Sequence, residues 1–298
     1  MELNNSRIQR DQPPHNIDRS EATRNNLLNG STFESYFEDG RRYTAENKTY
    51  FLPNDDKEYN RLNLQHSIMK TIWQGNFSAP VKHLLNQEGT KVLDVGTGSG
   101  SWTLDMATDY PKAKFIGVDI SPPPSNNIPK NIEFIEANVF ERLPFDDNTF
   151  DYVFQRLLYV GIPAKKWPSV VNELVRVLKP GGYLELQELD FRYTVMGPVT
   201  TKIINGIVDM SHERGLDPDL CYKLQGYMKD HNQLHDVHCE VKKKFDGDEN
   251  FQKMNYSAIL MGIKPKLMTI INLSSDEYDG MVKTVGKELV EFEAYYPH

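Results

Sequence analysis

A glycine-rich turn in the first third of the chain constrains the fold more than any other feature. Residues 91–100 are KVLDVGTGSG, a short apolar strand followed by three alternate glycines. Glycine lacks a Cβ, so the backbone can turn sharply there and approach a ligand closely. A strand, such a turn and a helix beginning at Ser101 are typical of the nucleotide-binding corner of a doubly wound α/β sheet. We therefore expect a mostly parallel sheet flanked by helices.

The spacing of the glycines distinguishes between the cofactors that such a corner binds. A dinucleotide-binding turn follows G-x-G-x-x-G/A, with a pyrophosphate at the helix N-terminus. Here Gly100 comes one residue early, and Asp94 lies two residues before Gly96. A carboxylate in that position repels a pyrophosphate but attracts an ammonium or hydroxyl group. S-adenosylmethionine (SAM) carries an amino group and no phosphate, so the pattern favours SAM over NAD. A glycine-bearing turn without a ligand is the alternative.

Two further strand ends carry polar side chains suited to the adenosine part of SAM. Asp119 lies near the end of the strand expected over residues 115–120. It lies about twenty residues after the glycine turn, where a carboxylate can accept both ribose hydroxyl protons. Asn138 ends the run 132–138, and its amide can pair with an adenine edge while Val139 packs on the ring. The alternatives are a solvated strand-end aspartate and an ordinary turn asparagine.

Four motifs in order give the chain a family resemblance. VLDVGTGSGSW, FIGVDIS, IEFIEANVFERLPFDDNTFDYVFQR and VLKPGGYLELQE, between residues 90 and 190, resemble class I SAM-dependent methyltransferases. Upstream, residues 40–43, 50–55 and 61–66 resemble the LaeA-like methyltransferases of fungi. That family includes regulators of secondary metabolism and development, some of them nuclear and partnered with velvet proteins. The resemblance implies a doubly wound, mostly parallel Rossmann-like sheet, SAM as cofactor and methyl transfer as the reaction.

The resemblance also assigns parts of SAM to particular residues. It assigns the methionine part to Asp94 and the backbone of residues 96–100, and the ribose and adenine to Asp119 and Ile120. Gln155, at the tip of the strand 151–156, faces the sulfonium end in this interpretation; a solvent-facing strand end is the alternative. The expected cofactor-binding residues are Arg61, Asp94, Gly96, Thr97, Gly98, Gly100, Asp119, Ile120, Asn138, Val139 and Gln155.

A helix is expected over residues 55–74, upstream of the glycine turn. Asp55 can cap its N-terminus, with Glu58 three residues later as in a capping box. Its apolar stripe needs a surface to cover, so we expect residues 43–73 to form a lid over the cofactor. Arg61 would point inward and pair with the SAM carboxylate. A surface salt bridge, or a helix that only buttresses the sheet, is the alternative. The stripe consists of Leu62, Ile68, Met69, Ile72 and Trp73.

No catalytic residue can be assigned from the sequence. A sulfonium already activates the methyl group, so a base is needed only for acceptors that lose a proton. His66 on the upstream helix is a candidate base, although a packed histidine is the favoured interpretation. Tyr159 and Trp167 follow the fourth strand and are candidates for the acceptor side, with core packing the favoured explanation of Trp167.

The chain divides into parts by composition. Residues 36–51 are expected to be ordered but irregular, Lys179–Gly182 is expected to cap the helix 167–178, and two or three helices are expected between Pro198 and Asp230. Alternation over 236–245 predicts a sixth strand. The family's final antiparallel strand would begin about where the sequence stops, so that strand is expected to be missing. The expected parts are a disordered tail (1–32), a helical lid segment (33–88) and a SAM-binding domain (89–298) with helical insertions at 195–232 and 250–272.

Charge and cysteine content exclude several classes of protein. The net charge of −8 argues against a general nucleic-acid binder, because nonspecific binding rests on Lys and Arg contacts to phosphate. Lys242–Lys244 is a single short basic run, and a solvated strand edge is its favoured interpretation. With two cysteines, no disulfide framework is implied, and His231, His235 and His238 match no zinc spacing. No metal is therefore expected.

The lack of a long apolar run predicts a soluble protein of the cytoplasm, the nucleus or both, without a membrane contact. We expect a SAM-dependent methyltransferase whose acceptor, a small molecule or a protein, is not identified. A velvet-type protein partner is implied by the resemblance. The alternative function is a regulatory protein with a methyltransferase fold that binds SAM and partner proteins with little or no turnover.

Overall fold

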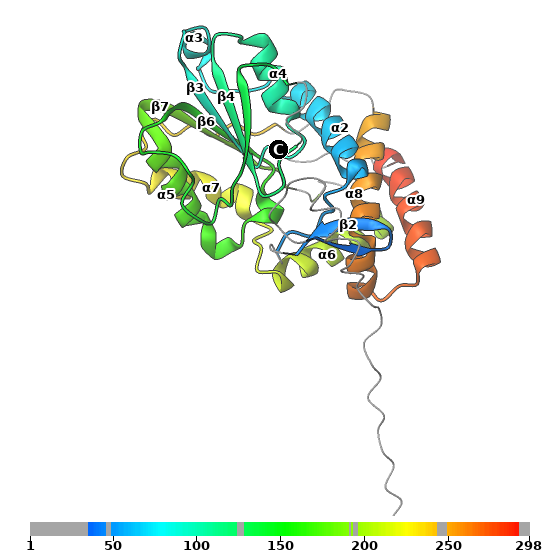
Figure 1. The fold of residues 1–298 in the computed structure, drawn as a ribbon. Coiled ribbons are helices and arrows are strands. Elements are labelled where there is room, and N and C mark those ends of the chain that lie inside the picture. Colours follow the sequence, from blue (N-terminus) through cyan, green and yellow to red (C-terminus); the bar gives the residue numbers. More distant parts are fainter. Residues whose placement is uncertain are drawn as a thin grey trace, which may run out of the picture.

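The computed structural model describes residues 35–45, 49–123, 128–190, 192, 196–242 and 249–291. The tail 1–32 lies outside these residues. Within them, the central sheet has five strands in the order β5-β4-β3-β6-β7, and all neighbouring pairs are parallel. The expected doubly wound sheet is confirmed (Figure 1). The strands are β3 (Lys91–Val95), β4 (Lys114–Asp119), β5 (Ile132–Glu136), β6 (Phe150–Arg156) and β7 (Leu178–Gln187).

Alternate residues of each strand supply two hydrophobic layers, one on each face of the sheet. Val92 and Phe115 pack with the helices α3 (Lys82–Leu85) and α4 (Ser101–Asp109). Their neighbours in sequence, such as Leu93, pack on the other face with α5 (Trp167–Val177). Side chains in a strand alternate between faces, and both faces are covered, which explains the nearly continuous apolar runs.

A helical layer follows the sheet in the chain. It contains α6 (Pro198–Glu213), α8 (Glu249–Ile270) and α9 (Ser275–Glu291), which pack on one another, whereas α7 (Leu220–Lys229) packs on α5. Helix α8 lies beside α9 and beside α2 (Asp56–Trp73), which precedes the sheet in sequence (Figure 1). The two helices α6 and α7 confirm the prediction for the region between Pro198 and Asp230.

The prediction of a sixth strand over 236–245 is wrong for the described residues 236–242, which contain no strand. Val241 is 54% exposed, so the alternation there does not bury an apolar face. The predicted cap at Lys179–Gly182 is also wrong. The backbone becomes extended at Leu178 and continues directly into β7, where Gly181 has a positive φ of 78°.

The segment expected to be irregular contains an antiparallel hairpin of β1 (Ser35–Glu38) and β2 (Arg41–Thr44). Asp39 and Gly40 join the strands with φ values of 51° and 68°. Two positive φ angles match the twist of a hairpin, and Asp-Gly is a common sequence for such a turn.

Contacts with α8 fix the hairpin in place. The Tyr43 hydroxyl donates a hydrogen bond to the Gly262 carbonyl at 2.8 Å. The Lys266 ammonium lies 3.3 Å from the Tyr43 ring centroid and donates to the Phe51 carbonyl. Burial lowers the pKa of Lys266 to about 7.

Helix α2 confirms the helix predicted over 55–74. The Asp55 carboxylate accepts a hydrogen bond from the Glu58 backbone N–H at 3.0 Å, which caps the N-terminus. Gln74 ends the helix in the left-handed conformation, with φ of 55°. The Glu58 side chain does not complete a capping box, because it pairs with Arg61 instead.

Candidate cofactor-binding site

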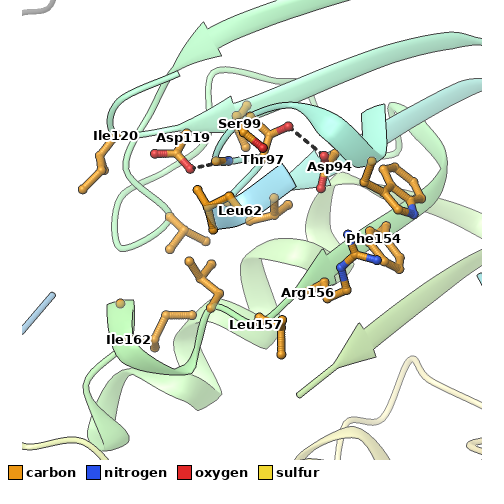
Figure 2. A pocket seen from close by; sticks show the side chains of 18 of the residues that line it. Leu62, Asp94, Thr97, Ser99, Asp119, Ile120, Phe154, Arg156, Leu157 and Ile162 are labelled. Atoms are coloured by element: carbon orange, nitrogen blue, oxygen red, sulfur yellow. Dashed lines mark hydrogen bonds between the residues drawn. The ribbon is translucent and has the colours of Figure 1, made fainter. Parts of the chain in front are cut away.

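A pocket opens at the carboxyl ends of the parallel strands, where open α/β sheets bind ligands. Figure 2 shows Asp119 and Ile120 at one end of it and Asp94, Phe154 and Arg156 at the other. Helix α2 and the segment before it form a further wall. The lining residues are Tyr50, Leu62, Gln65, His66, 94–99, Ser101, Trp102, 118–120, 137–140, Phe154, 156–158, Gly161 and Ile162.

The glycine turn forms the floor of the pocket. The backbone N–H groups of Gly96 and Thr97 donate to the Val118 carbonyl, which ties the turn to β4. Gly98 has φ of 54°, and a Cβ there would lie 3.2 Å from Leu62 Cδ1. Gly100, in contrast, does not line the pocket. A Cβ at Gly100 would lie 2.7 Å from the Phe134 ring, so this glycine permits packing.

Asp94 is held rigidly beneath the turn. Its Oδ2 accepts hydrogen bonds from the Thr97 hydroxyl at 2.7 Å and the Thr103 hydroxyl at 2.6 Å. The residue is 4% exposed. Burial raises the pKa of Asp94, and the two hydroxyl donors oppose that effect. The Thr97 side chain therefore orients Asp94, and this role was not foreseen from the sequence.

At the other end, Asp119 bridges the glycine turn and the loop after β4. Its two oxygens accept hydrogen bonds from the backbone N–H groups of Gly98 and Ser121, both at 2.9 Å. Each carboxylate oxygen retains a further lone pair for a ligand. Burial raises the pKa of Asp119. Asn138 accepts from the Phe140 N–H at 3.0 Å, so it is a turn asparagine that also lines the pocket, as do Ile120 and Val139.

The prediction for Gln155 is wrong. Its side chain is fully buried and donates to Glu188 Oε1 at 2.6 Å, away from the pocket. Alternation along β6 explains the error, because neighbouring residues of a strand face opposite sides. Phe154 and Arg156 face the pocket instead. Burial raises the pKa of Glu188 to about 7.

Arg156 is the functional candidate that the sequence reasoning missed. Its guanidinium donates to His66 Nδ1 at 2.9 Å and lies 5.7 Å from the Phe154 ring centroid. Among the described residues, no carboxylate lies within salt-bridge distance of it. Burial lowers the pKa of Arg156 to about 10. The signal was available, since Arg156 ends the strand one residue after Gln155.

Arg61 does not point into the pocket, so that prediction is wrong. It is 4% exposed, pairs with Glu58 at 2.6 Å and donates to Asn255 Oδ1 on α8 at 3.1 Å. Residues three and four apart share a helix face. That rule places Leu62, Gln65 and His66 together on the pocket side, while Arg61 faces α8.

His66 connects three elements. Its Nε2 lies 3.1 Å from Asp105 Oδ2 on α4, and its Nδ1 accepts from Arg156 on β6. Lys70 donates to the same Asp105 oxygen. Burial lowers the pKa of His66, and Arg156 lowers it further against the opposing effect of Asp105. Both ring nitrogens are therefore occupied.

The wall near the β6 end is mostly apolar. It contains Tyr50, Leu158, Gly161 and Ile162. Trp167 is 1% exposed in the hydrophobic core, and Tyr159 is also buried and does not line the pocket. Core packing therefore explains both residues that were candidates for the acceptor side.

Comparison with known proteins agrees with this geometry. A methyltransferase domain family matches residues 92–182. Methyltransferase str2 of Strobilurus tenacellus is 30% identical over 200 residues, which is 65% of this chain and 70% of that protein. This chain belongs to the methyltransferase family. This chain is also 35% identical over 164 residues to methyltransferase pytC of Aspergillus terreus, and the match covers 54% of this chain and 48% of pytC.

Regulators are found among the relatives as well. The secondary metabolism regulator laeA of Aspergillus flavus is 32% identical over 160 residues, 52% of this chain and 42% of laeA. A solved SAM-dependent methyltransferase from Aquifex aeolicus matches with a TM-score of 0.32 and 22% identity, over 52% of this chain and 87% of that one. The protein is a methyltransferase, and its methyl acceptor is not identified.

Three general properties hold for the described residues. None of their helices is long and apolar enough to span a membrane. They also contain no group of three or more His, Cys, Asp or Glu side chains arranged to hold a metal ion. Cys221 and Cys239 are both free thiols.

Proposed function

We propose that the methyltransferase binds SAM along this pocket, with the methionine part at Asp94 and Arg156 and the adenosine part at Asp119. One observation carries the proposal. At one end the pocket presents a guanidinium that has no carboxylate partner among the described residues. SAM carries a carboxylate at one end and a ribose diol at the other, so its polar groups match the pocket.

At the methionine end, charge complementarity supports the proposal. Arginine binds carboxylates through two parallel hydrogen bonds, and such charge-assisted bonds are among the strongest in proteins. Asp94 attracts the SAM ammonium group electrostatically. These two side chains would therefore hold both charged groups of the amino acid and fix its orientation.

At the adenosine end, Asp119 has lone pairs available for the ribose hydroxyl groups while it remains anchored by Gly98 and Ser121. Ile120 and Val139 offer apolar contact to the adenine ring, and Asn138 offers polar contact. A valine side chain at Gly98 would reach toward Leu62, so the glycine leaves room for a ligand close to the backbone.

SAM, when bound, supplies a methyl group that is already activated on a sulfonium. The residues of this chain therefore bind, align and exclude water. Leu62 on α2 covers the glycine turn, and the wall of Tyr50, Leu158, Gly161 and Ile162 would guide an acceptor toward the donor. His66 is a poor candidate for a base, because both of its nitrogens are engaged.

A second candidate function is a regulatory role with little turnover, in the cytoplasm or nucleus. The match to laeA regulators favours it, and the family resemblance makes a velvet-type protein the expected partner. Both candidates require SAM binding but differ in whether a product forms.

Calorimetric titration with SAM, S-adenosylhomocysteine and NAD tests the binding site. We expect the first two to bind and NAD to fail, and the reverse order would refute the proposal. Incubation with methyl-labelled SAM and a fungal extract then separates the candidates. A labelled product that depends on Arg156 supports the enzyme, and SAM binding without any labelled product supports the regulator.

A further inference from the structure

We infer that His66 is a positioning residue, which holds the Arg156 guanidinium at the methionine end of the pocket so that helix α2 completes the cofactor site. The inference rests on the proposed function, because Arg156 needs a ligand with a carboxylate. It assigns to α2 a chemical task beyond covering the pocket.

The first step concerns the freedom of Arg156. An arginine side chain has many rotamers, and ordering it costs conformational entropy. The hydrogen bond to His66 Nδ1 at 2.9 Å fixes one terminal nitrogen of the guanidinium. Arginine has five N–H donors in a planar fork, so the remaining donors stay available for a ligand. A guanidinium fixed in this way would be ready to receive a carboxylate.

The second step concerns the protonation of the His66 ring. Arginine can only donate, so Nδ1 must be the acceptor and carry no proton. In the neutral ring Nε2 then carries the proton and donates to Asp105 Oδ2 at 3.1 Å. Asp105 is in turn fixed by Lys70. The carboxylate on α4 therefore selects the tautomer that Arg156 requires.

The third step excludes a direct role of His66 with the ligand. The neutral ring donates to Asp105 and accepts from Arg156, so no N–H remains for a ligand carboxylate. Burial and the neighbouring Arg156 both lower the pKa of His66, which favours the neutral form at physiological pH. Its influence on the ligand must therefore pass through Arg156.

Two ligands distinguish positioning from packing. S-adenosylhomocysteine carries the amino-acid carboxylate, whereas methylthioadenosine contains the same adenosine and lacks the amino acid. If His66 acts through Arg156, its loss weakens the first ligand and spares the second. If His66 only packs α2 against the pocket, its loss weakens both ligands alike.

Two nearly isosteric variants provide the test. His66→Leu removes the acceptor, whereas His66→Asn keeps a carbonyl oxygen close to the position of Nδ1. By calorimetry of the full chain, we expect His66→Leu to weaken S-adenosylhomocysteine roughly tenfold, with methylthioadenosine unchanged. We expect His66→Asn to restore most of the affinity. Circular dichroism and thermal unfolding show whether each variant folds.

The outcomes separate this inference from the proposed function. If the unmodified protein binds neither ligand, the proposed function fails. If it binds both but the two variants lose equal affinity for both ligands, or lose none, the positioning role of His66 is refuted. If the leucine variant does not fold, the asparagine variant still tests the inference. The inference is contradicted if His66→Asn binds S-adenosylhomocysteine more weakly, relative to methylthioadenosine, than the unmodified protein does.

Discussion

Exchanging one arginine for methionine should have opposite effects at Arg156 and Arg61. No carboxylate of the described residues lies within salt-bridge distance of Arg156, and burial lowers its pKa to about 10 from an ordinary value of 12.5, although Asp94 and Glu185 oppose that shift. One pKa unit corresponds to about 1.4 kcal/mol, so keeping Arg156 charged in the folded protein costs at most on the order of 3 kcal/mol. Arg156→Met removes this cost, and the loss of the donor to His66 Nδ1 offsets part of the gain, so we expect the ligand-free protein to become more stable by less than that amount.

The same substitution should weaken cofactor binding. Each charge-assisted hydrogen bond to the ligand carboxylate contributes about 1.5–3 kcal/mol, so the affinity for S-adenosylhomocysteine should fall at least tenfold. Thermal unfolding with and without the ligand measures both effects in one experiment. The variant should unfold at a higher temperature alone, and the ligand should raise that temperature less than it does for the unmodified protein.

Arg61→Met is the matched control. Its side chain and that of Glu58 are 3% and 2% exposed, and they pair at 2.6 Å. Removing one partner of a buried pair leaves the other charge uncompensated and costs about 3–5 kcal/mol. The folded control should still bind the ligand, since Arg61 lies outside the pocket. A destabilised Arg156→Met protein, or one with unchanged affinity, would refute the reasoning.

The remaining predictions concern the turn, the ribose site, the hairpin and the lid. Gly98→Val should abolish SAM binding in calorimetry, because φ of 54° disfavours a branched residue and its Cβ would crowd Leu62; wild-type affinity in a folded variant would contradict this. Asp119→Ala should weaken methylthioadenosine at least about tenfold, and unchanged binding would put the ribose elsewhere. The pKa of Lys266 is about 7 in the folded protein, against an ordinary value of 10.5. Between these two values the unfolded chain binds more protons than the folded protein, so the unfolding temperature should rise with pH from about 7 toward about 10. Lys266→Met should remove that rise. SAM should slow hydrogen exchange across residues 55–70, and the absence of protection there would reduce α2 to a scaffold.

The strands and their polar ends could be predicted because they depend on local patterns. Apolar runs of strand length, separated by turns and helices, predict a parallel sheet, and the residues at the strand tips then meet at one edge. Asp94, Asp119 and Asn138 were predicted in this way, and all three line the pocket. The helix start at Asp55 followed from cap chemistry, which also acts over a few residues.

The errors occurred where the outcome depends on direction or on distant contacts. Gln155 and Arg156 are neighbours, and a pattern of apolar residues does not say which of them faces the pocket. Arg61 pairs with Asn255, which is 194 positions away, and no local signal predicts that contact. The hairpin at Asp39 is a different case, because its Asp-Gly turn was visible and was overlooked.

The contact between Arg61 and Asn255 has a consequence for the order of folding. Helix α2 is synthesised early, but its docking surface on α8 is synthesised much later, and the contact from Tyr43 to Gly262 spans 219 positions. Contacts between distant positions form slowly, because the chain must first close a long loop. On the ribosome, the sheet and its glycine turn can assemble and contact one side of α2 while its other side still lacks α8. The cofactor pocket would then be completed last, when α8 emerges.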